Sequence, residues 1–223
     1  MLTLVPAPLT DEAILAALAE FQLTATYKQV QQIQQYIAVL LKWNDKINLT
    51  AIRDPREILY RHFCESMYAT AAVPVENGRL ADVGSGGGFP GIPIKILRPD
   101  LHVFLIESNV KKATFLAEVA RDLELADLRV LVNRFEDLVA EDVAPLDYVC
   151  SRALGEFVPF LSWAGSEAIA AKTAILWIGG RDLDEVMKIE GWNWREPIPV
   201  PQSLRRLLLV GTKKVPPDVG VTT

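Results

Sequence analysis

A glycine-rich segment that follows an apolar run offers the clearest chemistry in this sequence. Five glycines occur between positions 84 and 91, directly after the β-rich run 80–83. Such a turn tolerates positive φ angles and lets the backbone approach a ligand closely. Gly84, Gly86 and Gly88 fit the G-x-G-x-G spacing typical of S-adenosylmethionine (SAM) sites. Gly86, Gly88 and Gly91 fit the G-x-G-x-x-G spacing of dinucleotide sites. Because Gly84 immediately follows the expected strand, the SAM spacing is favoured.

Polar and aromatic side chains follow the other expected strands of the same region. In open α/β sheets, ligands bind beyond the carboxyl ends of the strands, so these positions are candidates for the same site. Glu107 ends the second strand, where a carboxylate can accept hydrogen bonds from the ribose hydroxyls of either NAD or SAM. Phe135 and Glu136, after the third strand, are placed to contact an adenine ring and its amino group. Arg152 ends the fourth strand, where a ligand or phosphate contact is favoured over a surface salt bridge.

Motifs of several other methyl-transfer chemistries are absent from the sequence. No Asn/Asp-Pro-Pro-aromatic run of an amine methyltransferase follows the fourth strand, and Cys150 lacks the preceding proline of a cytosine-C5 nucleophile. If methyl transfer is the reaction, the acceptor therefore needs neither a covalent adduct nor an amine-stabilising loop. A ring nitrogen with a free lone pair, such as guanine N7, meets that condition, and the protein would mainly hold acceptor and methyl group in line.

The elements that must position these residues alternate between strand and helix patterns. Short β-rich runs at 80–83, 103–107, 129–133, 148–151 and 174–178 are separated by helical patterns, notably at 110–123 and 157–171. This alternation predicts a parallel sheet with helices on both faces. The runs 196–200 and 207–212 have no helix between them, which predicts an antiparallel hairpin at the sheet edge.

The first 75 residues have a helical pattern without strands. Thr10 precedes one apolar helical run, a second helix is expected from Thr26 to Trp43, and Asp54 followed by Pro55 marks a third helix start. The sequence thus predicts a helical extension over 1–75, a ligand-binding domain over 76–215 and a loose tail over 216–223.

Composition and charge exclude several classes of protein. The 223 residues are 50% hydrophobic and 23% charged, which is a globular composition. Two cysteines and two histidines are too few for a disulfide framework or a clustered metal site, which favours the cytoplasm and no bound metal. No apolar stretch is long enough to span a membrane. The net charge of −5 argues against whole-surface attraction to nucleic acid, but basic residues concentrate at 42–62 and 202–214 and could form one basic face.

Together and in order, the motifs of this sequence resemble those of the bacterial RsmG (GidB) family, the guanine-N7 methyltransferases of small-subunit ribosomal RNA. The matching residues are Trp43-Asn44, Asn48-Leu49-Thr50, Arg61-His62, Glu65-Ser66, Asp82 to Pro93, Glu107-Ser108, Lys111-Lys112, Phe115-Leu116, Arg134, Glu136 and Ser151-Arg152-Ala153. The resemblance implies a class I, Rossmann-like, mostly parallel seven-stranded sheet with a C-terminal antiparallel hairpin and a helical N-terminal extension.

The resemblance also implies an activity and a set of contacts. The activity is transfer of the methyl group of SAM to N7 of guanine 527, in the 530 loop of 16S ribosomal RNA within the small subunit, by a protein expected to be a monomer. The family's cofactor contacts correspond here to Gly84, Phe89, Phe135, Glu136 and Arg152. The family has no agreed general base, as expected if N7 needs no deprotonation. Candidate RNA contacts are Arg61, His62, Lys111, Lys112, Arg205 and Arg206. His62 could equally be hydrogen-bonded inside the fold.

One position departs from the family pattern. The family commonly has a lysine after the fifth strand, where this sequence has Ile178, and Arg181 is the nearest cation that could substitute. Two alternatives remain open at this point. One is a methyltransferase of the same fold that acts on another RNA or a small molecule, and the other is a non-catalytic module that binds NAD or another nucleotide.

Overall fold

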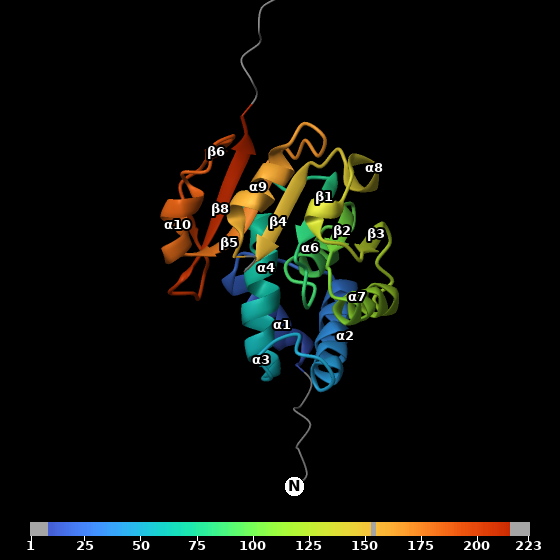
Figure 1. Ribbon diagram of the computed structural model, residues 1–223. Helices are drawn as coiled ribbons and strands as arrows, with labels where there is room; N and C mark the ends of the chain where they lie inside the picture. Colours follow the sequence, from blue (N-terminus) through green and yellow to red (C-terminus); the bar gives the residue numbers. More distant parts are fainter. Residues whose placement is uncertain (1–8, 153–154, 215–223) are drawn as a thin grey trace, which may run out of the picture.

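A single sheet with helices on both faces forms the centre of the computed structural model, which describes residues 9–152 and 155–214 (Figure 1). Within these residues, eight strands join in the order β3-β2-β1-β4-β5-β8-β6, and β7 pairs with β8. Strands β1 to β5 are parallel, as predicted, while β8 is antiparallel to β5, β6 and β7. The strands are β1 (Arg79–Val83), β2 (His102–Ile106), β3 (Leu128–Leu131), β4 (Tyr148–Arg152), β5 (Thr173–Gly179), β6 (Trp192–Trp194), β7 (Ile198–Pro199) and β8 (Arg206–Lys213).

The helices also follow the predicted order. They are α1 (Asp11–Glu20), α2 (Tyr27–Asn44), α3 (Pro55–Ile58), the π-helical turn η1 (Leu59–Cys64), α4 (Glu65–Met67), α5 (Ala69–Ala72), α6 (Gly91–Leu97), α7 (Val110–Asp122), the 3-10 turn η2 (Phe135–Asp137), α8 (Ala140–Val143), α9 (Phe157–Gly165) and α10 (Gly180–Val186). Asp54 caps α3 as predicted, and Thr10 and Thr26 cap α1 and α2. Each of these side chains accepts a backbone N–H of the first turn. The predicted tail 216–223 and Ala153 lie outside the described residues.

The structure differs from the predicted elements in the last third of the chain. The helix expected over 157–171 ends at Gly165, and Ser166 begins a turn in which Ala170 has a φ of 52°. The strand expected over 196–200 is reduced to β7, because prolines at 197, 199 and 201 have no N–H to donate to a neighbouring strand. The sheet has eight strands instead of seven, since Trp192–Trp194 also pairs with β8.

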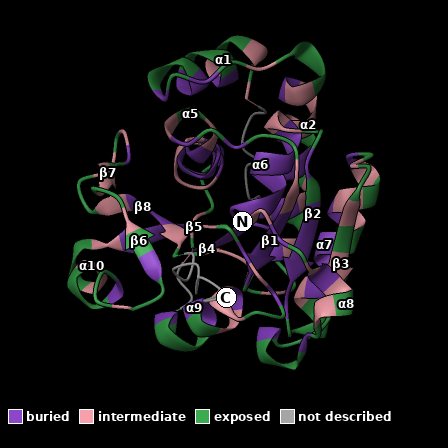
Figure 2. Cartoon of the chain, turned by 90° about the horizontal axis from the view of Figure 1, so that it is seen from above, coloured by how far each residue is buried: buried purple, intermediate pink, exposed green. Residues whose placement is uncertain are grey.

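Alternate residues of each strand face two separate hydrophobic cores. On β2, Val103 and Leu105 belong to the core under α1, α2, α6 and α7, while Phe104 and Ile106 belong to the core under α8 and α9. Figure 2 shows the buried strands between these two helical layers. The helices of the N-terminal region therefore share one core with the sheet.

Helix α6 lies between the sheet and the N-terminal helices and has almost no exposed surface (Figure 2). Its first residue, Gly91, donates its N–H to Asp82 Oδ2 at 2.9 Å. A Cβ at Gly91 would lie 2.6 Å from Leu105 Cδ2 and 2.7 Å from Asp82 Oδ2. Glycine is required at this position because the helix approaches β1 and β2 too closely for any side chain.

We predict that Gly91→Ala destabilises the protein, because the new methyl group overlaps buried atoms. The expected loss in the free energy of unfolding is about 1–3 kcal/mol, as for other overpacked cores. The matched control is Gly180→Ala, since Gly180 also begins a helix and a Cβ there meets nothing within 4 Å. That control should leave stability unchanged or raise it by about 0.4–1 kcal/mol. Urea denaturation of both variants measures the difference, and equal stabilities would contradict the packing argument.

Candidate functional site

The segment between β1 and α6 forms a compact loop at the carboxyl edge of the sheet. Gly84, Gly86 and Gly88 have φ angles of 73°, 55° and 83°, which side-chain-bearing residues rarely adopt. The N–H groups of Gly84 and Ser85 both donate to the carbonyl of Ile106 at the end of β2, at 2.9 and 3.1 Å. The alternating glycines of the SAM spacing are therefore those whose backbone conformation requires glycine.

Helix α2 fixes the second half of this loop through Tyr36, a residue that no sequence motif singles out. Tyr36 is fully buried and its hydroxyl donates to the Gly87 carbonyl at 2.5 Å. A side chain at Gly88 would overlap that hydroxyl. The Tyr36 ring also stacks on Phe89, with centroids 5.5 Å apart. The helical spacing of Tyr36 from Ile33 and Leu40 could have predicted that it faces the core, but not that it holds the loop.

Glu107 joins the loop to the next strand. Its Oε2 accepts the Gly86 N–H and its Oε1 accepts the Asn109 N–H, at 2.9 and 2.8 Å, and only 7% of the residue is exposed. Each carboxylate oxygen retains a second lone pair for another donor. A Cβ at Gly86 would meet no atom closer than 3.8 Å, so the loop has open space on that side. An open glycine beside a nearly buried carboxylate fits the ribose end of SAM.

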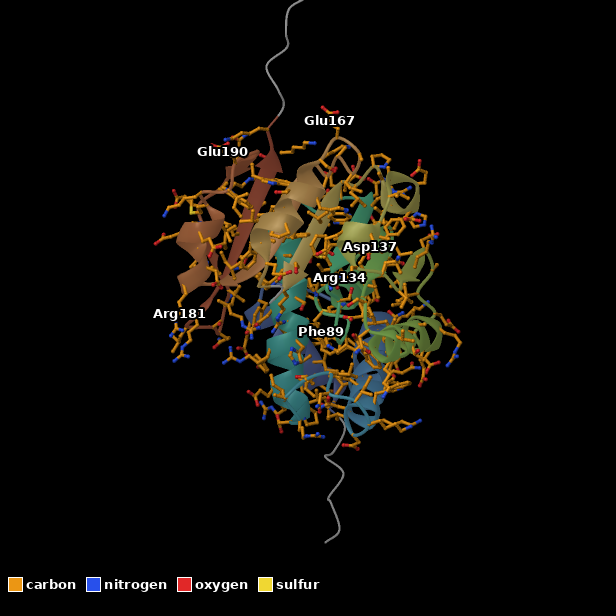
Figure 3. The ribbon with its side chains drawn as sticks, in the orientation of Figure 1. Phe89, Arg134, Asp137, Glu167, Arg181 and Glu190 are labelled. Carbon is orange, nitrogen blue, oxygen red and sulfur yellow. The ribbon has the colours of Figure 1, made fainter. Side chains whose placement is uncertain are left out.

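Phe135 and Glu136 follow β3 at the same edge of the sheet, as the sequence predicts. Phe135 is 6% exposed and packs edge-on against Phe160 and Trp163, with centroids 6.1 and 5.6 Å away. Glu136 Oε2 lies 3.8 Å from the Nε of Arg134. Figure 3 shows Phe89 and Arg134 in the central part of the molecule, near the carboxyl ends of the parallel strands, and Glu167 and Glu190 at the opposite end.

Arg152 ends β4 as predicted, and in this structure its guanidinium lies against the helical region. Its Nη2 is 3.4 Å from Glu65 Oε2 and its Nη1 is 3.4 Å from Ser66 Oγ. Only 9% of its side chain is exposed. The interaction is therefore a buried ion pair and not a surface salt bridge.

Glu65 brings two of the predicted RNA-binding residues together with Arg152. Arg61 Nη1 lies 3.0 Å from Glu65 Oε1, and Arg206 Nη1 lies 2.5 Å from Glu65 Oε2. Arg205, which precedes β8, is exposed and is not part of this group. Glu65 occurs in the family-like motif, but nothing in its spacing indicates that it is buried among arginines.

His62 is held inside the fold and stacks on the loop. Its Nε2 is 2.6 Å from Thr50 Oγ1, and its ring lies on Phe89 with centroids 4.6 Å apart. Burial, and secondarily the charge of Arg206, lowers the pKa of His62 to about 4, so the ring is neutral at pH 7. Its Nδ1 is buried without a hydrogen-bond partner among the described residues. His62 is therefore hydrogen-bonded inside the fold, although its ring lies beside the glycine loop.

Lys111 and Lys112 lie at a hollow between the start of α7 and the segment after α2. The hollow has a volume of about 390 Å³ and also contains Lys46 and Arg53, which belong to the basic segment 42–62. Asp45 is the acid in its lining, and it pairs with Arg53 at 3.0 Å. Four basic residues against one acid make this a positively charged surface on the β2 side of the glycine loop.

The position where the family has lysine contributes to the core. Ile178 is 2% exposed and lies in the hydrophobic core under α9. Arg181 is exposed and lies at the edge of the molecule, away from Phe89 (Figure 3). The structure does not bring Arg181 to the loop as a substitute for the missing lysine.

Residues 9–152 and 155–214 contain neither a metal-ligand cluster nor a membrane-spanning helix. No group of three or more His, Cys, Asp or Glu residues in this part of the chain could hold a metal ion. None of the described helices is both long and apolar enough to cross a membrane.

Known proteins resemble this chain in both sequence and fold. The family model described as rRNA small subunit methyltransferase G (GidB) matches residues 29–191. A ribosomal RNA small subunit methyltransferase G of Pelotomaculum thermopropionicum is 38% identical over 200 residues, which cover 80% of this chain and 83% of the relative. A protein of the same name from Roseiflexus castenholzii is 37% identical over 210 residues, which cover 85% of each chain.

Solved structures give the fold at lower sequence identity. A SAM-dependent methyltransferase from Aquifex aeolicus has a TM-score of 0.57 at 14% identity, covering 72% of this chain and 94% of its own. A ribosomal protein L11 methylase from Lactobacillus delbrueckii has a TM-score of 0.53 at 16% identity, covering 70% and 80%. These two structures confirm the class I methyltransferase fold predicted from the sequence. The family model, which extends from α2 through the glycine loop to the start of β6, and the two sequence relatives show that the chain belongs to the rRNA small subunit methyltransferase G family.

Proposed function

We propose that this protein transfers the methyl group of SAM to N7 of guanine 527 in 16S ribosomal RNA. The observation that carries the proposal is the open glycine loop with Glu107 at the carboxyl edge of the sheet, in a chain of this family. Basic residues border the loop on two sides, with Lys111 and Lys112 toward β2 and Arg206 toward β5. A SAM site between positive surfaces suits a polyanionic substrate better than a neutral small molecule.

The cofactor contacts are proposed on the residues that the glycine loop and the neighbouring strand ends bring together. They are Gly84, Gly86, Gly88, Phe89, Glu107, Phe135, Glu136 and Arg152. Bound SAM supplies a methyl group that its sulfonium makes electrophilic. The loop glycines leave room for the cofactor, Glu107 accepts from its ribose, and Phe135 packs against its adenine. We assign SAM binding to a domain over 76–215. We assign RNA binding to both the helical extension over 1–75 and the rim of the sheet.

No proton has to leave guanine N7 before it is methylated, so the site needs no general base. His62, the histidine next to the loop, is neutral at pH 7 and is already hydrogen-bonded to Thr50. Asp82 is fully buried and binds the N–H of Gly91. Both groups therefore support the loop, and the chain accelerates transfer by holding the guanine in line with the methyl group.

RNA contacts are proposed for Arg61, Lys111, Lys112, Arg205 and Arg206. His62, which is hydrogen-bonded to Thr50 and stacked on Phe89, is assigned to the support of the loop instead. The hollow at the start of α7 adds Lys46 and Arg53 to this surface. We further propose that the protein acts as a monomer on RNA of the small ribosomal subunit, in the cytoplasm where that subunit is assembled.

The direct test is transfer of tritium from labelled SAM to small subunits from a strain that lacks the modification. Naked 16S RNA and an unrelated RNA are the controls, and the labelled nucleotide is mapped. We expect label at N7 of one guanine in the 530 loop. Label at another nucleotide would overturn the assigned position, and SAM binding without any label would overturn the substrate.

We predict that Glu107→Gln weakens SAM binding, because one acceptor oxygen and the negative charge are removed at the ribose. The Kd for SAM should rise by about tenfold, as expected for one hydrogen bond to a charged group. Wild-type protein with SAM at 100 times its Kd should gain about 2.7 kcal/mol of stability, while NAD should give no gain. Glu141→Gln, an exposed acid on α8, is the control. Unchanged SAM affinity in Glu107→Gln would show that Glu107 does not contact SAM.

We predict that Lys111→Ala combined with Lys112→Ala weakens RNA binding and its dependence on salt. The slope of log K against log salt concentration should fall by about 0.7 for each phosphate that the protein no longer neutralises. Lys188→Ala removes an exposed lysine that follows α10 and should leave the slope unchanged. If the double variant keeps the wild-type slope, the hollow beside α7 is not part of the RNA surface.

A further inference from the structure

Three arginines from distant parts of the chain surround one buried carboxylate, that of Glu65. Arg61 comes from η1, Arg152 from the end of β4 and Arg206 from the start of β8. Their guanidinium nitrogens lie 3.0, 3.4 and 2.5 Å from the Glu65 oxygens, and 1% of the Glu65 side chain is exposed. We name Glu65 and these three residues the arginine cluster.

The arginine cluster has more positive charge than its carboxylate can neutralise. One carboxylate against three guanidiniums, which remain charged at all physiological pH values, leaves two formal positive charges at one place. The low pKa of His62 has the charge of Arg206 as its second cause, after burial, which is consistent with this excess. Like charges held this close are unfavourable unless an anion joins them. The cluster therefore has positive charge left over with which an anion can pair.

Two of the three arginines are placed to receive that anion. The side chains of Arg61 and Arg206 are 40% and 38% exposed, whereas that of Arg152 is 9% exposed. Within the described part of the chain, the guanidinium groups of Arg61 and Arg206 each bind protein groups through Nη1 alone. Nη1 of Arg61 donates to Glu65 and to the carbonyl of Gln202, and Nη1 of Arg206 donates to Glu65. The remaining N–H groups of each guanidinium form the planar fork that matches the oxygens of a phosphate group.

The arginine cluster lies next to the site of methyl transfer. Arg206 pairs with Gly179 at the carboxyl end of β5, and Arg152 is at the carboxyl end of β4. His62, adjacent to Arg61 in the π-helical turn, stacks on Phe89 of the glycine loop at 4.6 Å. A cavity of about 270 Å³ adjoins Arg61 and Glu65, and its wall also contains Arg56, Glu57 and Gln202. There is thus space for a ligand group beside Arg61.

We propose that Glu65 is a positioning residue that holds Arg61 and Arg206 as a paired site for one phosphate group of the substrate RNA, beside the nucleotide that receives the methyl group. The inference rests on the proposed function for the identity of the anion. Glu65 prevents the two arginines from separating, because each donates to a different oxygen of the same carboxylate. Trp177 holds Glu65 in turn, since its indole N–H donates to the Glu65 carbonyl at 2.7 Å.

Binding of unmodified naked 16S RNA, measured over a range of salt concentrations, tests the paired site. Arg61→Ala combined with Arg206→Ala should lower the slope of log K against log salt concentration by about 0.7–0.9, the value for one neutralised phosphate. A slope that does not change, or one that falls by twice this amount, overturns the paired site. Arg121→Ala, which breaks an exposed ion pair with Asp122 at the far end of α7, should leave the slope unchanged.

Glu65→Gln tests the positioning role, because charge and position predict opposite results. If Glu65 acted only by its charge, its removal would leave three uncompensated arginines and RNA would bind more tightly. We expect the Kd for RNA to rise instead, by about tenfold, because the arginines are no longer held together. Tighter or unchanged RNA binding by the folded variant overturns the positioning role.

A second variant covers the case in which Glu65→Gln does not fold. Arg206→Lys keeps the charge and removes the planar fork, so the salt slope should stay the same while the Kd for RNA rises several-fold. An unchanged Kd for RNA would contradict the proposal that the planar guanidinium of Arg206 binds the phosphate group. All these measurements record binding, whereas failure of the proposed function appears as the absence of methyl transfer by wild-type protein, so the two failures are distinguishable.

Discussion

The turn between β1 and α6 depends on two carboxylates that bind its backbone N–H groups. Asp82 accepts from Gly91 and Glu107 accepts from Gly86, each at 2.9 Å. The two carboxylates are buried almost completely, and burial raises the pKa of Asp82 to about 7 although the Gly91 N–H opposes that rise. Burying carboxylates is costly unless they are hydrogen-bonded. The hydrogen bonds offset part of this cost, since Asp82 Oδ1 has no partner among the described residues, and they fix the glycine loop at the carboxyl edge of the sheet.

The helical N-terminal region completes the loop from the other side. Tyr36 binds the Gly87 carbonyl, and the rings of Tyr36 and His62 both stack on Phe89. These contacts belong to the same hydrophobic core that the helices share with the sheet. Removing the helices would therefore expose the face of α6 and release the loop, so the region is part of the site as well as a candidate surface for RNA.

Local patterns predicted much of this fold, and long-range contacts explain what they missed. The parallel strands, the helix that starts after Thr26, the cap at Asp54 and the alternating glycines follow from periodicity and from backbone conformation, which are local properties. The roles of Tyr36 and Glu65 depend on Gly87 and Arg206, which are 51 and 141 positions away in the chain. No spacing in the sequence indicates such contacts. The short β7 could have been predicted, because its prolines lack N–H groups for pairing.

The chemistry of N7 methylation explains why the charged groups near the loop are arranged in this way. A lone pair attacks the methyl group directly, so the acids and the histidine are free to serve as supports: Asp82 and Glu107 bind backbone, and His62 stays neutral. Positive charge is instead concentrated where a polyanion would arrive, at the hollow beside α7 and at the arginine cluster. The two basic surfaces lie on opposite sides of the glycine loop. An RNA strand that contacts both by the direct route would therefore pass over the loop. Such a strand would bring its base to the methyl group through phosphate contacts alone, which is sufficient for a reaction that needs orientation and no proton transfer.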